Sequence, residues 1–87
     1  MHAPTLHLRR SQLVVRDHVL EVFAGHLSIG RVLLVGATTT LDGPHRRGRY
    51  RLAVCDAGGN EVFRERIDPG EHPRAVEFVA ALRSSPA

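Results

Sequence analysis

The chain has 87 residues, of which 43% are apolar and 24% are charged, a composition typical of a globular domain and unlike that of a disordered or fibrous protein. All twelve basic side chains are arginine, yet the formal net charge is only +3, well below the dense positive charge of a dedicated DNA-binding domain. The single cysteine, Cys55, excludes an intrachain disulfide, and the sequence shows neither a secretory signal nor an apolar run long enough to span a membrane, so we expect a cytoplasmic protein.

The first part of the chain has the alternating apolar and polar pattern of short strands. Strands are expected over residues 6–9, 12–16, 19–23 and 27–29, with a turn at Asp17-His18. Residues 17–26 also fit a helix, because Val19, Phe23 and Leu27 are spaced four residues apart. The density of valine favours strands, and the helix stays open as the alternative.

Residues 31–41 predict a central strand that is buried almost continuously over residues 32–35 and becomes polar at its three threonines. Gly36 in the middle of this segment indicates a bulge or a bend. Residues 42–48 are rich in turn-forming residues and predict a loop that carries Arg46 and Arg47.

A β-hairpin is predicted over residues 49–67, around the turn-forming residues 56–60. In the expected register Val54 lies opposite Phe63, and Arg51 lies opposite Arg66. One face of the hairpin is then apolar, with Glu65 as its only charge, and the other face is basic.

The C-terminal residues 73–84 predict a helix, because Pro73 suits the first helical position and an apolar stripe follows it. The stripe consists of Ala75, Phe78, Val79 and Leu82. Strands within about residues 5–67 followed by this helix predict an α+β fold, mainly antiparallel β, in which a small sheet or barrel of about six strands is closed by one C-terminal helix. We expect a single small domain over residues 1–87.

In the order of its predicted elements the chain resembles small bacterial pleckstrin-homology-like (PH-like) domains. The segments that carry this resemblance are Leu27-Ser28-Ile29, Val32-Leu33-Leu34-Val35, residues 49–67 and residues 73–82. The resemblance implies a meander of strands closed by one helix. The phosphoinositide-type site of that family, a basic loop between its first two strands, is not matched, because only Arg9 and Arg10 lie near that position.

The histidines and the cysteine form no recognisable catalytic or metal-binding motif. The six histidines show none of the short spacings of a zinc site, and we expect them at surface positions. Cys55 lies within the predicted hairpin, where a packing role is expected. The sequence therefore predicts no catalytic residue, no metal and no cofactor, and we do not expect an enzyme.

The arginines form the one charged cluster that stands out. The candidate binding residues are Arg46, Arg47, Arg49, Arg51, Arg64 and Arg66. Two interpretations stay open: water and neighbouring carboxylates such as Glu21 and Asp42 screen a solvated face, or the face binds an anion. We expect a non-catalytic binding or assembly module, above all one for protein–protein interaction, with nucleic-acid or phosphate-group binding as the alternative. Self-association through a sheet edge is a further expectation, at residues 6–9 or 62–67. The first edge is favoured, because Arg64 and Arg66 should blunt the second.

Overall fold

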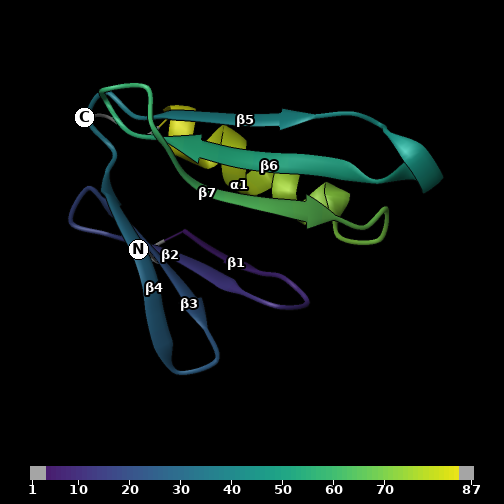
Figure 1. The fold of residues 1–87 in the computed structure, drawn as a ribbon, viewed down its shortest axis with the longest axis horizontal. Coiled ribbons are helices and arrows are strands. Elements are labelled where there is room, and N and C mark those ends of the chain that lie inside the picture. The colour runs from purple at the N-terminus through teal and green to yellow at the C-terminus, as the bar shows by residue number, and fades with distance from the viewer. Residues whose placement is uncertain (1–3, 85–87) are drawn as a thin grey trace.

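The computed structural model describes residues 4–84, and within them the chain forms seven strands and one α-helix (Figure 1). The first antiparallel sheet contains β1 (Thr5–His7), β2 (Gln12–Arg16), β3 (Val19–Ala24) and β4 (Leu27–Leu33). The second contains β5 (Thr38–Asp42), β6 (Tyr50–Cys55) and β7 (Glu61–Ile67), and α1 (His72–Ser84) follows. The predicted α+β fold with a C-terminal helix is confirmed. The strands number seven where about six were predicted, and they form two separate sheets that are not closed into a barrel.

The β2–β3 hairpin answers the open question of residues 17–26. The two strands pair antiparallel, with Val15 opposite Leu20, and the turn residues Asp17 and His18 have φ angles of 52° and 64°. Positive φ at both central residues is the geometry of a two-residue hairpin turn whose twist matches the flanking strands. The helical alternative is therefore wrong, because these residues pair in a sheet.

The prediction of one central strand over residues 31–41 is wrong. The chain leaves β4 after Leu33, turns, and crosses to the second sheet. Gly36 lies in this crossing with a φ of 79°, and a Cβ there would come within 2.9 Å of the Ala57 side chain, so the position requires glycine. Leu33 ends the outer strand β4 and Val35 lies in the crossing that follows it, and they are 66% and 63% exposed instead of buried.

The predicted register of the β6–β7 hairpin is confirmed. Val54 pairs with Phe63, and Arg51 pairs with Arg66. The apolar face is the core face, as Leu52 and Val54 show with 0% exposure. The arginines of the hairpin are therefore directed away from the core, because successive side chains of a strand point to opposite faces.

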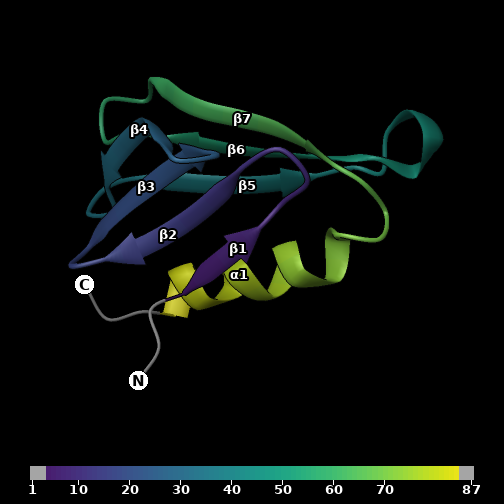
Figure 2. The same ribbon diagram turned by 90° about the horizontal axis from the view of Figure 1, so that it is seen from below.

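The helix α1 closes one side of the core by contacting β1 and β5, which belong to different sheets (Figure 2). Its predicted apolar stripe is buried, with Ala75, Phe78 and Val79 at 0%, 4% and 5% exposure. On another side of the core β4 approaches β7. The predicted helix over residues 73–84 is thus confirmed, with its start at His72. In the described part of the chain no helix is long and apolar enough to cross a membrane.

Both edge segments predicted from the sequence lie on outer strands. β1 contains the first half of the segment 6–9, and β7 contains the segment 62–67. The other two outer strands are β4 and β5. Of the two outer strands of the first sheet, β4 is the longer, and the shorter strand β1 is contacted by α1.

Candidate functional site

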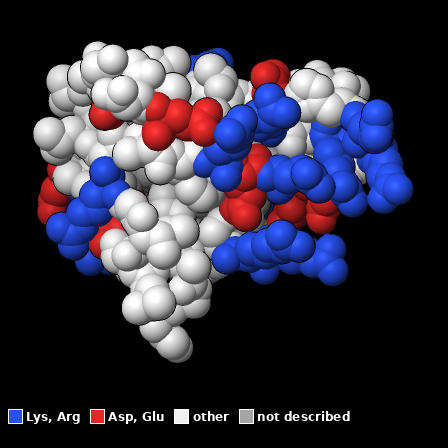
Figure 3. Space-filling view, viewed as in Figure 1, with Lys and Arg blue, Asp and Glu red and all other residues white. Residues whose placement is uncertain are grey.

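The six predicted binding residues line one open hollow of about 620 Å³, which we call the arginine hollow. Arg46 and Arg47 belong to the 3₁₀ turn η1 (Arg46–Gly48), and Arg49 lies between η1 and β6. Arg51 belongs to β6, and Arg64 and Arg66 belong to β7. His45 and Glu65 complete the described lining. Figure 3 shows the arginines as a blue area at the end of the molecule where η1 lies in Figure 1.

Strand alternation and one turn bring these arginines together. Arg64 and Arg66 are two residues apart on β7 and share its outer face, and Arg51 on β6 lies directly opposite Arg66. The backbone N–H of His45 donates to the carbonyl of Arg49 at 2.6 Å, which folds the η1 turn back toward β6. The arginines of the turn are thereby held beside those of the strands.

Four of the six arginines form no ion pair with any residue of the described range 4–84. Arg64 Nε lies 3.1 Å from Glu61 Oε1, and Arg49 Nε lies 3.7 Å from Asp68 Oδ1. The four exposed arginines without a carboxylate partner are Arg46, Arg47, Arg51 and Arg66. The described lining holds one carboxylate against six arginines, so the hollow carries positive charge that the fold itself leaves uncompensated.

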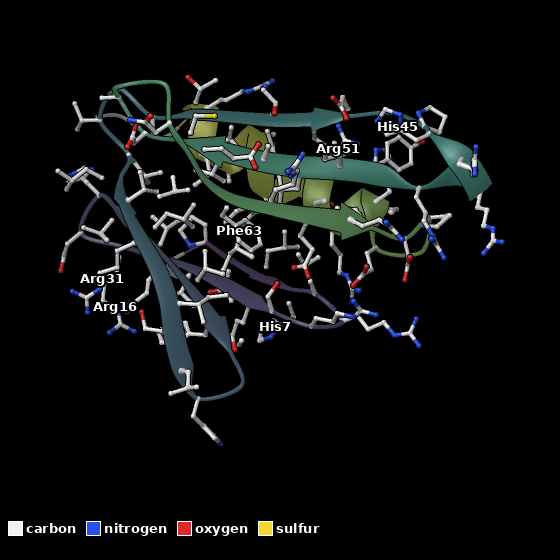
Figure 4. The ribbon with its side chains drawn as sticks, in the orientation of Figure 1. His7, Arg16, Arg31, His45, Arg51 and Phe63 are labelled. Atoms are coloured by element: carbon white, nitrogen blue, oxygen red, sulfur yellow. The ribbon has the colours of Figure 1, made fainter. Side chains whose placement is uncertain are left out.

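Glu21, one of the two carboxylates expected to screen the arginine face, lies elsewhere. It belongs to the first sheet, where it accepts hydrogen bonds from Ser28 Oγ at 2.6 Å and Arg31 Nε at 3.1 Å. The Ser28 hydroxyl and then the Arg31 guanidinium hold the pKa of Glu21 below its ordinary value. Figure 4 shows Arg31 beside Arg16 and well apart from Arg51. Glu21 therefore neutralises a different arginine.

Asp42, the second expected screening residue, is close to the hollow but contacts a histidine. It pairs with Arg51 in the register of β5 and β6. Its carboxylate Oδ1, however, lies 2.9 Å from His45 Nε2 and forms no ion pair with an arginine of the described chain. Arg51 thus keeps its charge free on the surface.

A second hollow, of about 330 Å³, lies beside the arginine hollow and was not predicted. The two hollows share Arg49, Arg64, Glu65 and Arg66. The second adds Arg9, Arg10, Asp68 and Glu71. The arginine doublet at residues 9–10 is visible in the sequence, but its approach to β7 depends on how the two sheets pack, which no local pattern indicates.

Exposed aliphatic side chains are concentrated on β4 and the segment that follows it. Leu27, Ile29, Leu33 and Val35 are between 56% and 72% exposed. Because β4 is an outer strand, one side of its backbone has no strand partner within the described sheet. Exposed apolar groups beside a strand edge are a feature expected of a protein-binding surface.

Among the described residues, His45, His72 and Cys55 lie in different places and make no contact with one another that could form a common site. His45 contacts Asp42, and the ring of His72 stacks on Tyr50 with ring centroids 3.6 Å apart. Cys55 is a half-buried free cysteine at the end of β6. Within residues 4–84 the structure brings together no group of three His, Cys, Asp or Glu side chains that could hold a metal ion.

Comparison of the chain with protein-family models, curated proteins and solved structures gives no match. The resemblance to PH-like domains stays a prediction that rests on the order of the elements. The function has to be argued from the geometry and charge of the hollows.

Proposed function

We propose that this protein is a non-catalytic binding module that binds an acidic segment of a partner protein in the arginine hollow. One observation carries the proposal: six arginines line the hollow against one carboxylate, and four of them have no ion-pair partner among the described residues. The lining contains only arginine, histidine and glutamate, so none of its described residues is a serine, threonine, cysteine or lysine that could act as a nucleophile.

The pairing of Arg51 with Arg66 supports an anionic ligand. Like charges directly opposite each other on a sheet destabilise it, and here both side chains are exposed and unpaired. A guanidinium presents its N–H donors as a planar fork that matches the two oxygens of a carboxylate. Carboxylates of a partner would therefore offset the repulsion and gain charge-assisted hydrogen bonds at the same time.

The second candidate function is binding of a nucleic acid or another phosphate group in the same hollow. Clustered arginines suit phosphate as well as carboxylate. However, none of the described residues lining the arginine hollow is Phe, Tyr or Trp, so it offers no aromatic ring on which a base could stack. The exposed aliphatic residues of β4 add a feature that favours a protein partner.

The proposal is tested by titrating a fluorescent oligoglutamate peptide against three forms of the protein. The double variant Arg51→Gln/Arg66→Gln should bind about tenfold more weakly than wild type, because two charged contacts and part of the electrostatic steering are lost. Its affinity should also depend less on salt. The matched control is Arg16→Gln/Arg74→Gln, which removes the same charge from exposed positions outside both hollows.

Equal affinity of both double variants would contradict the proposal, because net charge alone would then explain binding. An oligonucleotide of equal charge serves as the competing ligand. Tighter binding of the oligonucleotide with the same dependence on the two arginines would establish the second candidate function in place of the first.

A further inference from the structure

The arginine hollow continues into the second hollow, because four residues line both. We propose, resting on the proposed function, that the acidic segment of the partner is an extended peptide that occupies both hollows, and that Arg10 and Arg9 form a second contact site at its far end. The arginine hollow alone would receive a single carboxylate or a short acidic turn. The two hollows together form a longer groove between η1 and the turn that joins β1 to β2.

The β1–β2 turn is held by two hydrogen bonds, one to β7 and one to the residue that precedes α1. The hydroxyl of Ser11, which is 8% exposed, donates to Glu65 on β7. The backbone N–H of Arg9 donates to Glu71 Oε2 at 2.8 Å. These contacts cross between elements far apart in the sequence, so they fix the arginine doublet beside β7. In Figure 3 two blue areas on this face lie on either side of red carboxylates.

Asp68 forms ion pairs with an arginine of the β1–β2 turn and with an arginine that lines both hollows. Its oxygens lie 3.7 Å from Arg9 Nη1 and 3.7 Å from Arg49 Nε. Arg10 is exposed and forms no ion pair with any residue that the structure describes. Among the described residues, the second hollow therefore contains two arginines without an ion pair, Arg10 and the shared Arg66. Its three carboxylates already have partners within the fold.

This alternation of charge selects a peptide over a nucleic acid. The second hollow has five arginines against three carboxylates, whereas the arginine hollow has six against one. The backbone of a nucleic acid carries phosphates at short, regular intervals, about one per 3.4 Å of each strand, and would bring some of them against the carboxylates. A peptide can place its acidic side chains opposite the free arginines and neutral residues opposite the carboxylates.

The reach of an extended peptide suits such a groove. Eight residues in a strand-like conformation span about 26 Å at about 3.3 Å per residue. The longest dimension of the molecule is 35 Å, so a segment of that length fits along one face. A segment of about three residues spans roughly 10 Å and would occupy the more positive arginine hollow alone.

The experiment compares two acidic peptides on three single variants. The shorter peptide has about three glutamates, and the longer has about eight residues, with glutamates at both ends and neutral residues between them. Arg51 lines only the arginine hollow, Arg10 lines only the second hollow, and Arg16 lines neither. Arg10→Gln should weaken the longer peptide about two- to fivefold, the range for one exposed charge pair, and leave the shorter peptide unchanged. Arg51→Gln should weaken both peptides, and Arg16→Gln neither.

Two results overturn the inference in distinguishable ways. If Arg51→Gln weakens both peptides and Arg10→Gln weakens neither, the second hollow has no part in binding, and the proposed function stands without it. If an oligonucleotide of matched charge binds more tightly than the longer peptide and its binding depends on Arg10, the groove recognises phosphate and the peptide assignment falls. If neither variant affects either peptide, the proposed function falls together with the inference.

Discussion

Removing one arginine of the cross-strand pair should raise the stability of the protein. Arg51 and Arg66 face each other directly, are exposed, and have no carboxylate partner among the described residues. Two unit charges about 6 Å apart in water repel each other by about 0.7 kcal/mol. In a chain of this length about 1 kcal/mol shifts the melting temperature by roughly 4–8 °C. We therefore expect Arg66→Gln to melt roughly 3–5 °C above wild type at low ionic strength.

The assay is thermal unfolding at low salt and again at about 1 M salt, where the Debye length falls to about 3 Å. The advantage of Arg66→Gln should disappear at high salt, because its cause is charge repulsion. Two variants serve as controls. Arg74→Gln on the exposed face of α1 should change little, and Arg64→Gln should lower stability slightly, because Arg64 pairs with Glu61.

A melting temperature of Arg66→Gln below that of wild type would refute the reasoning. Arg66 would then be stabilised by carboxylates or by packing of its aliphatic stem, and the arginine face would be part of the framework. A gain that persists at high salt would show that the cause is not electrostatic.

The remaining predictions concern the core, one ion pair and the state of assembly. Phe78→Ala should lower the free energy of unfolding by about 3–5 kcal/mol in urea denaturation, whereas Val76→Ala, at a position 44% exposed on the same helix, should change it by less than about 0.5 kcal/mol; equal effects would show that Phe78 does not anchor α1. Ser28 and Arg31 hold the pKa of Glu21 below its ordinary value of 4.5. The charged carboxylate therefore stabilises the fold above that pH, and this contribution is lost as pH falls through the lowered pKa. The stability difference between wild type and Glu21→Gln should therefore shrink in acid, and a difference independent of pH would contradict this. Self-association through a sheet edge stays a prediction. A sedimentation experiment that finds only monomer would exclude it.

Local patterns were sufficient for the hairpins and for the helix. The alternation around Val54 and Phe63 and the turn residues between them determine one register, since a shift by one residue would turn the apolar side chains outward. The spacing of Ala75, Phe78 and Val79 likewise determines which side of α1 is buried. In the hairpins and the helix, the residues that determine the structure lie close together in the sequence.

The segment around Gly36 shows where local patterns fail. An unbroken aliphatic run, such as residues 32–35, is typical of a buried strand, but whether a strand is central depends on its neighbours. Here β4 has a strand partner on one side only and ends at Leu33, and Val35 lies beyond it in the crossing to the second sheet. Both residues are exposed although their sequence predicts burial. Nothing in the sequence distinguishes an aliphatic strand at an edge from one in the centre.

In the candidate site, too, local patterns predict some of the residues, and the packing of the two sheets determines the others. Arg51, Arg64 and Arg66 could be assigned to one surface from strand alternation, and Arg46 and Arg47 from their proximity along the chain. The contribution of the arginine doublet at residues 9–10 could not be predicted, because it depends on contacts between elements more than fifty residues apart. The extent of the groove is therefore a property of the packed sheets.

The β6–β7 hairpin carries the core on one face and the arginines on the other, and this division makes the proposed function separable from folding. Leu52, Val54 and Ile67 are 0% exposed, so burial of apolar surface anchors the hairpin. Arg51 and Arg66, on the opposite face, make no ion pair within the described chain, and their mutual repulsion works against the sheet. If the arginines had a structural role, replacing them would lower both the stability of the protein and its affinity for the ligand. If the arginines bind a ligand, replacing them should lower the affinity while the stability of the protein is retained or increased. That combination distinguishes a binding surface from a merely solvated one.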